Sequence, residues 1–187
     1  METTQRKPNI LVGVCGSVAA VKIPEIILCL SEFANIKVLI SKSAEHFLAC
    51  SKEYNPSVYN TFEEKKYELY YDCDEWNNYN HVKSDKVLHV ELRKWADIYL
   101  ICPLTANTLA KLSTGLCDTL IICPAMNTYM YDHPITKSQL NILHSWGIQC
   151  IEPICKVLAC GDQGKGALAT VDTIVKVCKQ NVVYDVS

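Results

Sequence analysis

The feature that most constrains the fold is a continuous apolar run, Ile98–Cys102, which leads directly into a polar loop. Five consecutive apolar residues are typical of a parallel strand that helices cover on both faces. We expect Pro103 to end this strand, and Thr105, Asn107 and Thr108 to follow at its carboxyl end. Ligands of open α/β sheets bind beyond the carboxyl ends of the strands. The sequence therefore predicts a site at this loop.

Similar apolar segments recur along the chain, and most of the segments between them have helical spacing. Further strands are predicted at Asn9–Val14, Ile36–Ser41, Leu120–Cys123 and Ile148–Glu152. One helix is predicted to follow Cys15–Val18 and to end near Glu32, and others cover Ser43–Cys50, Ala106–Ser113, Pro134–Trp146 and Val171–Lys179. This alternation predicts an α/β fold, a doubly wound Rossmann-like or flavodoxin-like parallel sheet with helices on both faces.

Length and composition favour one domain spanning residues 1–187. The 18 basic and 20 acidic residues are dispersed and give a net charge of −2, which argues against binding to nucleic acid or an anionic membrane. No apolar run has the length of a membrane span, and Met1–Pro8 is too polar for a signal peptide. The eleven cysteines are odd in number and lie largely in predicted strands and helices, which favours free thiols in the reducing cytoplasm.

Two stretches lack a regular pattern. In Ser51–Lys86, either Val58–Asn60 or Tyr67–Tyr71 is a candidate short strand, and the part rich in Asn and Asp is predicted to be loop. The aromatic residues of this stretch line a pocket or a subunit contact, or simply pack on the surface; they are Tyr70, Tyr71, Trp76 and Tyr79. Val157–Ala169 contains three glycines and is predicted to be a flexible segment able to close over a ligand.

Gly16 and Ser17 form a candidate phosphate-binding turn after the first strand. A turn at a helix N-terminus offers backbone N–H donors to an anion. The sequence there is neither GxGxxG nor a P-loop, so a simple strand-to-helix turn is the alternative. Ser41 and Ser43 add hydroxyl groups at the end of the neighbouring strand and favour phosphate binding.

Three side chains are candidates for chemistry, each with a structural alternative. His89 can act as an acid or base near neutral pH, or can make a structural hydrogen bond. Cys160 can be a reactive thiol or proton donor, or can pack inertly. Asn127 can bind a carboxylate, or can form a turn. Paired CxxC spacing and a GxSxG motif are both absent from the sequence, so we predict no metal site and no serine-hydrolase site.

Seven segments decide between these alternatives through their order along the chain. They are VGVCGSVAAVK, ISKSAEHFL, DEWNNYN, VLHVELRKWAD, PLTANTLAKLSTGLCD, PAMNTYM and LACGDQGKGALA. Together they resemble the flavin-dependent cysteine decarboxylases, from about Pro8 to Val177. The resemblance implies an FMN-dependent carboxy-lyase that converts 4′-phosphopantothenoylcysteine to 4′-phosphopantetheine and CO2 in coenzyme A synthesis. It also implies a homotrimer with sites at the subunit interfaces.

The resemblance also assigns roles to individual residues. His89 and Cys160 are implied to be catalytic, Cys160 as the proton donor to the intermediate. Asn127, with Ala125 and Met126, is implied to bind the substrate carboxylate. The residues implied to bind FMN are Gly16, Ser17, Val18, Ser41, Ser43, Phe47, Thr105, Ala106, Asn107 and Thr108.

The chain departs from the family pattern at three places. After Gly115–Asp118 the family continues with a helical segment containing Arg-Ala-Trp, whereas here Thr119 leads almost directly into the next strand. Tyr131 stands where Trp is common, and Thr170 replaces an acidic residue. Three alternatives therefore stay open: a non-catalytic regulatory or structural subunit, a shortened isoform with impaired activity, and decarboxylation of a peptide's C-terminal cysteine.

Overall fold

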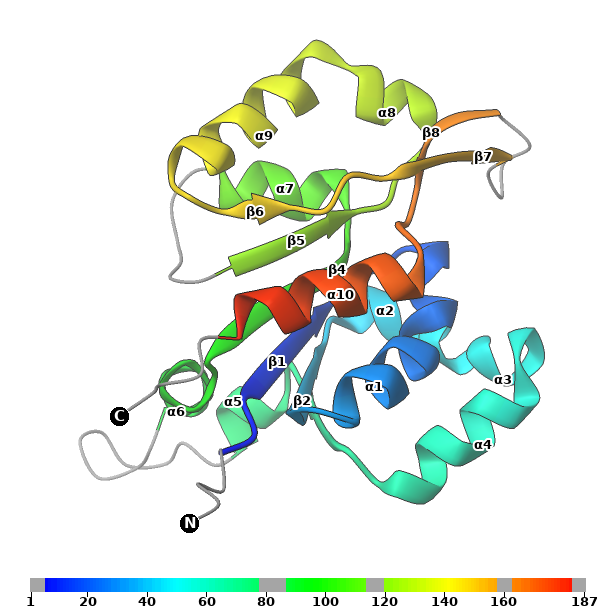
Figure 1. The fold of residues 1–187 in the computed structure, drawn as a ribbon, viewed down its shortest axis with the longest axis vertical. Coiled ribbons are helices and arrows are strands. Elements are labelled where there is room, and N and C mark those ends of the chain that lie inside the picture. Colours follow the sequence, from blue (N-terminus) through cyan, green and yellow to red (C-terminus); the bar gives the residue numbers. More distant parts are fainter. Residues whose placement is uncertain (1–5, 78–86, 114–119, 158–162, 183–187) are drawn as a thin grey trace.

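A six-stranded parallel sheet forms the centre of the computed structural model, which describes residues 6–77, 87–113, 120–157 and 163–182 (Figure 1). The strands are β1 (Asn9–Val14), β2 (Asn35–Ile40), β3 (Glu68–Tyr71), β4 (Ile98–Leu104), β5 (Leu120–Pro124) and β6 (Gln149–Cys150). Their spatial order is β3-β2-β1-β4-β5-β6, and every neighbouring pair is parallel. The chain thus moves outward from β1 through β2 and β3, and then crosses back to β4, which confirms the predicted doubly wound sheet.

Helices connect the strands, and a hairpin lies outside the sheet. The described helices are the 3-10 helix η1 (Val18–Lys22), α1 (Ile23–Ser31), α2 (Lys42–Ala49), α3 (Ser51–Tyr54), α4 (Pro56–Lys65), α5 (Asp74–Asn77), α6 (Leu88–Trp95), α7 (Ala106–Leu112), α8 (Thr128–Asp132), α9 (Pro134–Ser145) and α10 (Val171–Asn181). The antiparallel hairpin joins β7 (Ile154–Val157) to β8 (Gln163–Ala167). Within the described ranges, no helix is long and apolar enough to cross a membrane.

Buried side chains cover both faces of β4, which explains its uninterrupted apolar sequence. On one face, Ile27 of α1 and Ile174 of α10 share a buried cluster with Leu100 (Figure 1). On the other face, Leu109 of α7 is fully buried in a cluster with Ile101. Burying one such aliphatic side chain contributes about 1.5–3 kcal/mol. Helix packing on two sides therefore holds the strand from which the predicted site follows.

Two predicted boundaries at the sheet edge are wrong. β4 does not end at Pro103 but continues to Leu104, and its register with β5 shifts between Ile101 and Leu104. Proline is tolerated there because an irregular ladder does not need its missing N–H. The helix predicted from Ser43 begins one residue earlier, at Lys42, and Ser41 is its N-cap residue.

The irregular stretches contain more structure than the sequence predicted. Val58–Asn60 lies in α4, which begins at a proline and has Asn55 as its N-cap, whereas the strand lies within Tyr67–Tyr71. The glycine-containing stretch Val157–Ala169 includes most of the β7–β8 hairpin rather than only flexible loop. By contrast, the strand predicted at Ile148–Glu152 is shorter in the structure, where it has only two residues.

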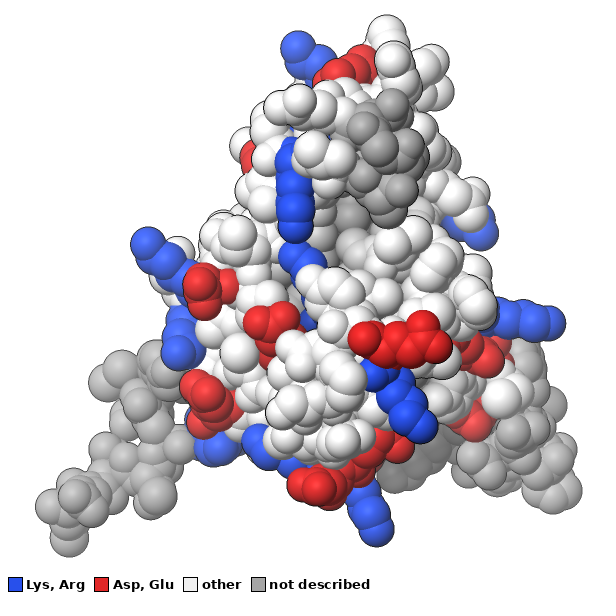
Figure 2. Space-filling view, turned by 90° about the vertical axis from the view of Figure 1, so that its right-hand side faces the viewer, with Lys and Arg blue, Asp and Glu red and all other residues white. Residues whose placement is uncertain are grey.

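Charged side chains on the face seen in Figure 2 are interspersed, with Lys and Arg next to Asp and Glu. This mixture of signs fits the net charge of −2. A nucleic-acid site would instead concentrate basic residues on one surface.

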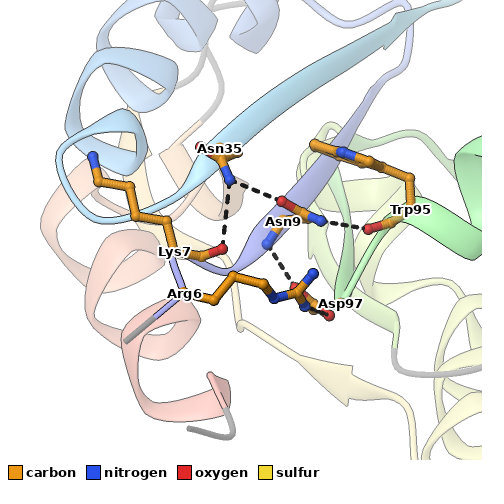
Figure 3. A network of polar contacts seen from close by, with 6 residues as sticks. All are labelled: Arg6, Lys7, Asn9, Asn35, Trp95 and Asp97. Carbon is orange, nitrogen blue, oxygen red and sulfur yellow. Dashed lines mark hydrogen bonds and ion pairs between the residues drawn. The ribbon is translucent and has the colours of Figure 1, made fainter. Parts of the chain in front are cut away.

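A polar network ties three strands together at the amino edge of the sheet (Figure 3). Asp97 accepts a hydrogen bond from the Asn9 backbone N–H at 2.7 Å and from the Arg6 guanidinium at 2.6 and 2.8 Å. The Asn9 amide donates to the Trp95 carbonyl at 2.8 Å and accepts from the Asn35 amide at 3.0 Å. Asn9 is only 7% exposed, so these bonds satisfy a buried polar group. The network fixes the starts of β1, β2 and β4 relative to one another.

We expect Asn9→Ala to lower the free energy of unfolding by about 1–3 kcal/mol, because it leaves the Trp95 carbonyl without its donor and leaves the Asn35 amide with the Lys7 carbonyl alone as acceptor. Urea denaturation measures this change. Asn60→Ala, at an exposed position on α4, is the matched control and should cause no loss. Equal stability of the two variants would contradict the structural role of Asn9.

Candidate functional site

Segments that follow four strands at the carboxyl edge of the sheet line a cavity of about 470 Å³, here called the loop cavity. The four strands are β1, β2, β4 and β5, which are neighbours in the sheet. The lining residues are Cys15, Gly16, Ser17, Ser41, Ser43, Thr105, Ala106, Asn107, Thr108, Lys111, Ala125, Met126 and Met130. Eight of the ten residues that the resemblance implied for FMN are among them, so the structure brings these eight together.

Hydroxyl groups and helix N-termini converge on the loop cavity. Ser17 is the N-cap of η1, and Thr105 is the N-cap of α7, where its Oγ1 accepts from the Thr108 N–H at 3.4 Å. Ser41 is the N-cap of α2 and makes no capping bond with its side chain; its Oγ lies 3.4 Å from that of Ser43. The positive ends of helix dipoles together with hydroxyl donors favour an anion such as a phosphate.

Gly16 allows the first two loops to approach each other closely. A Cβ atom at this position would lie 2.4 Å from Ser43 Oγ and 2.5 Å from Ser43 Cβ. Any side chain there would push the loops apart or fill the cavity. The glycine is therefore required by the shape of the loop cavity.

Cys15 and Lys111 also line the loop cavity, although the sequence did not single them out. Burial raises the pKa of the Cys15 thiol, while hydrogen bonds involving Thr108 and Thr105 oppose the shift. The net effect keeps the thiol protonated. The only sequence signal for Cys15 was its position directly before Gly16.

A second cavity of about 380 Å³ lies between η1 and the β7–β8 hairpin, and is here called the hairpin cavity. It shares Ser17, Ala125 and Met126 with the loop cavity. Its other lining residues are Val18, Ala19, Val21, Lys22, Tyr54, Asn127, Lys156, Val157, Gly166, Ala167 and Leu168. The cavity is thus mainly apolar, with one amide and two ammonium groups. Tyr54 and Lys156 were missed because they come from segments with no motif of their own, and Lys22 was missed although it ends the segment VGVCGSVAAVK.

Asn127 connects the hairpin cavity to α8. It is the N-cap of that helix, and its Oδ1 accepts from the Met130 N–H at 2.8 Å. This bond leaves the amide Nδ2 as the donor that the side chain can direct to a ligand. The capping role of Asn127 is therefore compatible with donation of a hydrogen bond to a ligand.

His89 lies on α6 and is not among the described residues that line the two cavities. Its side chain is 74% exposed, and its Nδ1 lies 2.7 Å from Glu75 Oε1. Glu75 also accepts from the His89 backbone N–H at 3.2 Å. A carboxylate that bonds to one ring nitrogen fixes the orientation of the imidazole. Within one protomer, His89 is separate from Asn127.

Three further candidates have other outcomes. Val18 lines the hairpin cavity, and Phe47 packs against the main core rather than lining the loop cavity. Cys160 lies outside the described residues.

The described part of the chain contains no group of three or more His, Cys, Asp and Glu that could hold a metal ion. The nine cysteines described there are all free thiols.

Comparisons with known proteins agree on one family. The family model described as Flavoprotein matches residues 1–122 and 119–183. A probable phosphopantothenoylcysteine decarboxylase from Arabidopsis thaliana is 43% identical over 183 positions, covering 90% of this chain and 86% of the relative. Phosphopantothenoylcysteine decarboxylase from Mus musculus is 41% identical over 187 positions, covering 91% of this chain and 85% of the relative.

Solved structures show the same similarity. A mutant PPC decarboxylase complexed with pantothenoylaminoethenethiol superimposes with a TM-score of 0.81 at 39% identity, covering 94% of this chain and 98% of that structure. The FMN-binding protein AtHal3 gives a TM-score of 0.76 at 39% identity, covering 94% of this chain and 96% of that structure.

The alignments also agree with a shortened crossover between α7 and β5. The Arabidopsis alignment spans 183 positions but only 90% of the 187 residues, so about 15 positions of it have no counterpart in this chain. The family match divides into two parts that overlap at residues 119–122, directly after the position at which the family's helical segment is missing.

We expect Gly16→Ala to abolish flavin binding at the loop cavity, because the new methyl group would collide with Ser43. Flavin absorbance of the purified variant measures the loss, and circular dichroism checks that the fold is kept. Combining Gly16→Ala with Ser43→Gly removes the colliding side-chain atoms and should restore part of the flavin. A Gly16→Ala protein with the same flavin absorbance as wild type would contradict the expectation that the loop cavity binds the flavin.

Proposed function

This chain belongs to the flavoprotein family, and on that basis we propose that it is an FMN-dependent carboxy-lyase acting on 4′-phosphopantothenoylcysteine. The products are 4′-phosphopantetheine and CO2, in coenzyme A synthesis. The observation that carries the proposal is that the loop cavity and the hairpin cavity meet at Ser17, Ala125 and Met126. A cofactor in the first and a substrate in the second would lie in contact, as a reaction between them requires.

The loop cavity has the donors that FMN requires. Gly16, Ser17, Ser41 and Ser43 offer a compact, hydroxyl-rich cradle for the phosphate at helix N-termini. The loop of Thr105–Thr108 follows β4 at the same edge of the sheet and suits the ring system. The similar structure AtHal3 is an FMN-binding protein, which supports FMN as the flavin.

The hairpin cavity matches the chemistry of the substrate. Asn127 offers an amide to the carboxylate that is lost as CO2. Lys22 and Lys156 line the same cavity and can bind the phosphate at the other end of the substrate. Apolar residues between these groups suit the uncharged middle of the molecule.

When bound, FMN supplies an electron acceptor and donor that makes loss of CO2 possible without net oxidation. Asn127 holds the carboxylate in place during this loss. His89, oriented by Glu75, accepts a proton from the cysteinyl part of the substrate. Cys160 gives a proton to the decarboxylated intermediate, a role that rests on the sequence resemblance.

His89 requires a second copy of the chain to reach the hairpin cavity. Within one protomer it is highly exposed and lines neither cavity. Exposed apolar side chains lie beside it at Val90 and beside Asn127 at Tyr129 and Met130, as expected at an interface. The proposed assembly is a homotrimer in which one protomer contributes His89 and its neighbour contributes Asn127. One domain spanning residues 1–187 and a cytoplasmic location, which free thiols favour, complete the proposal.

The shortened crossover is the reason to consider one alternative, a family member that lacks activity. A regulatory or structural subunit, or an impaired isoform, would tolerate loss of a segment between α7 and β5. Flavin content and CO2 release separate these alternatives from an active enzyme.

Purified protein is therefore expected to show flavin absorbance and to release CO2 from 4′-phosphopantothenoylcysteine. Asn127→Asp should raise the KM by at least about tenfold, because two carboxylates repel each other and the amide donor is lost. Coupled measurement of CO2 over a range of substrate concentrations tests both expectations. A protein that binds FMN but releases no CO2 would favour the regulatory alternative.

Co-expression of His89→Asn and Asn127→Asp chains tests whether two protomers form one site. At substrate concentrations well below the KM, each variant alone should have at most about a tenth of the wild-type rate, whereas random mixing in a ring should restore about one quarter of the sites. CO2 release by the co-purified mixture, compared with the two parents, gives the answer. A mixture no more active than its parents would show that His89 does not act on a neighbour's Asn127.

A further inference from the structure

A cluster of three side chains, Tyr131, Glu152 and Lys165, joins the β7–β8 hairpin to α8 next to the hairpin cavity. Glu152 Oε2 accepts from Tyr131 Oη and from Lys165 Nζ, each at 2.6 Å. The Lys165 ammonium also lies 5.2 Å from the centroid of the Tyr131 ring. The three residues come from α8, the segment after β6, and β8, so the cluster connects three separate elements.

The strand that carries Lys165 forms part of the hairpin cavity. Gly166 of β8 lines it, and the Gly166 carbonyl accepts from the Met126 N–H at 3.0 Å. A Cβ atom at Gly166 would lie 2.2 Å from the Met126 carbonyl oxygen, and one at Gly164 would lie 2.5 Å from Thr128 Oγ1. β8 therefore lies directly against the start of α8, as Figure 1 also shows. Lys165, between these two glycines, is the side chain that fixes the strand laterally.

The protonation states of the side chains in the cluster favour the hydrogen bonds that join the hairpin to α8. Despite partial burial, hydrogen bonds from Lys165 and Tyr131 lower the pKa of Glu152, which keeps the carboxylate ionised. Partial burial and the bond to Glu152 raise the pKa of Tyr131, so the phenol remains a donor. Hydrogen bonds to an ionised acceptor are shorter and stronger than neutral ones.

The cluster contributes little to global stability. The Glu152 and Lys165 side chains are 57% and 41% exposed, and ion pairs this exposed are weakened by solvent. The same contacts nevertheless restrict where β8 can lie relative to Asn127 and its neighbours. Their effect is therefore expected in the binding of a ligand rather than in folding.

We propose that Glu152 is a positioning residue, which holds Lys165 and Tyr131 together and thereby keeps the hairpin in place as one side of the substrate cavity. This inference rests on the proposed function for its substrate, 4′-phosphopantothenoylcysteine. Residues of β7 and β8 line the hairpin cavity and are absent from the lining of the loop cavity. Substrate binding should thus depend on the cluster, whereas flavin binding should not.

Glu152→Gln and Lys165→Met test the proposal in the full-length protein. Each should raise the KM about threefold to fivefold with little change in kcat, in flavin content or in Tm. The double variant should be no worse than either single variant, because the two residues act as one unit. Lys165→Arg keeps the charge and should stay close to wild type. Glu64→Gln, an exposed carboxylate on α4, is the matched control.

Hydrogen–deuterium exchange without substrate provides a readout that does not depend on activity. Glu152→Gln and Lys165→Met should speed exchange in β8 and at the Met126 amide, while the first strand of the sheet exchanges as in wild type. Unchanged exchange and KM would overturn the proposal. Loss of flavin or a large fall in Tm would also overturn it, since the cluster would then be part of the general fold. If wild-type protein shows no turnover, the proposed function fails, and exchange alone still decides whether Glu152 positions the hairpin.

Discussion

The pairing of β1 with β4 is the interaction on which the rest of the structure depends. Their register joins Ile10 to Ile98 and Gly13 to Ile101, and both strands are buried by helices. The chain leaves β1 toward β2 but leaves β4 toward β5, so the two loops diverge at this point. A doubly wound sheet necessarily opens a crevice where its strand order reverses. The loop cavity is that crevice, and its polar lining follows from the ends of buried strands.

Close backbone approach then gives the crevice its detailed shape. Gly16 brings the first loop against Ser43, and Gly164 and Gly166 bring β8 against α8. In both places a methyl group would meet atoms within 2.6 Å, which real contacts do not permit. The first approach shapes the loop cavity and the second shapes the hairpin cavity, and the two cavities share Ser17, Ala125 and Met126.

Sequence patterns predicted those parts of the fold and site that depend on local physical chemistry. The boundaries of Asn9–Val14 were correct because six consecutive buried positions leave a clear apolar pattern. The loop residues of the first cavity could be predicted because strand ends and helix N-caps have distinctive residue types. α4 and the β7–β8 hairpin were missed, since their residues are largely polar or exposed and acquire structure through tertiary contacts. Glu75, Lys22 and Lys156 were missed for a related reason: their relevance arises only from which residues lie near them in space.

The shortened crossover bears on whether the site survives, and its location argues that it does. The residues that line the loop cavity lie at the N-terminus of α7, whereas the shortening follows the C-terminus of that helix. β4 and β5 remain paired from Tyr99 with Leu120 through Ile101 with Ile122, so the crossover still reaches the correct register. Leu109 remains fully buried against α9 and fixes the position of α7. A connection of about a dozen residues suffices between parallel strands, and the segment from Thr105 to Thr119 has that length. The shortening therefore lies between the C-terminus of α7 and the start of β5, at the opposite end of α7 from the residues that line the loop cavity.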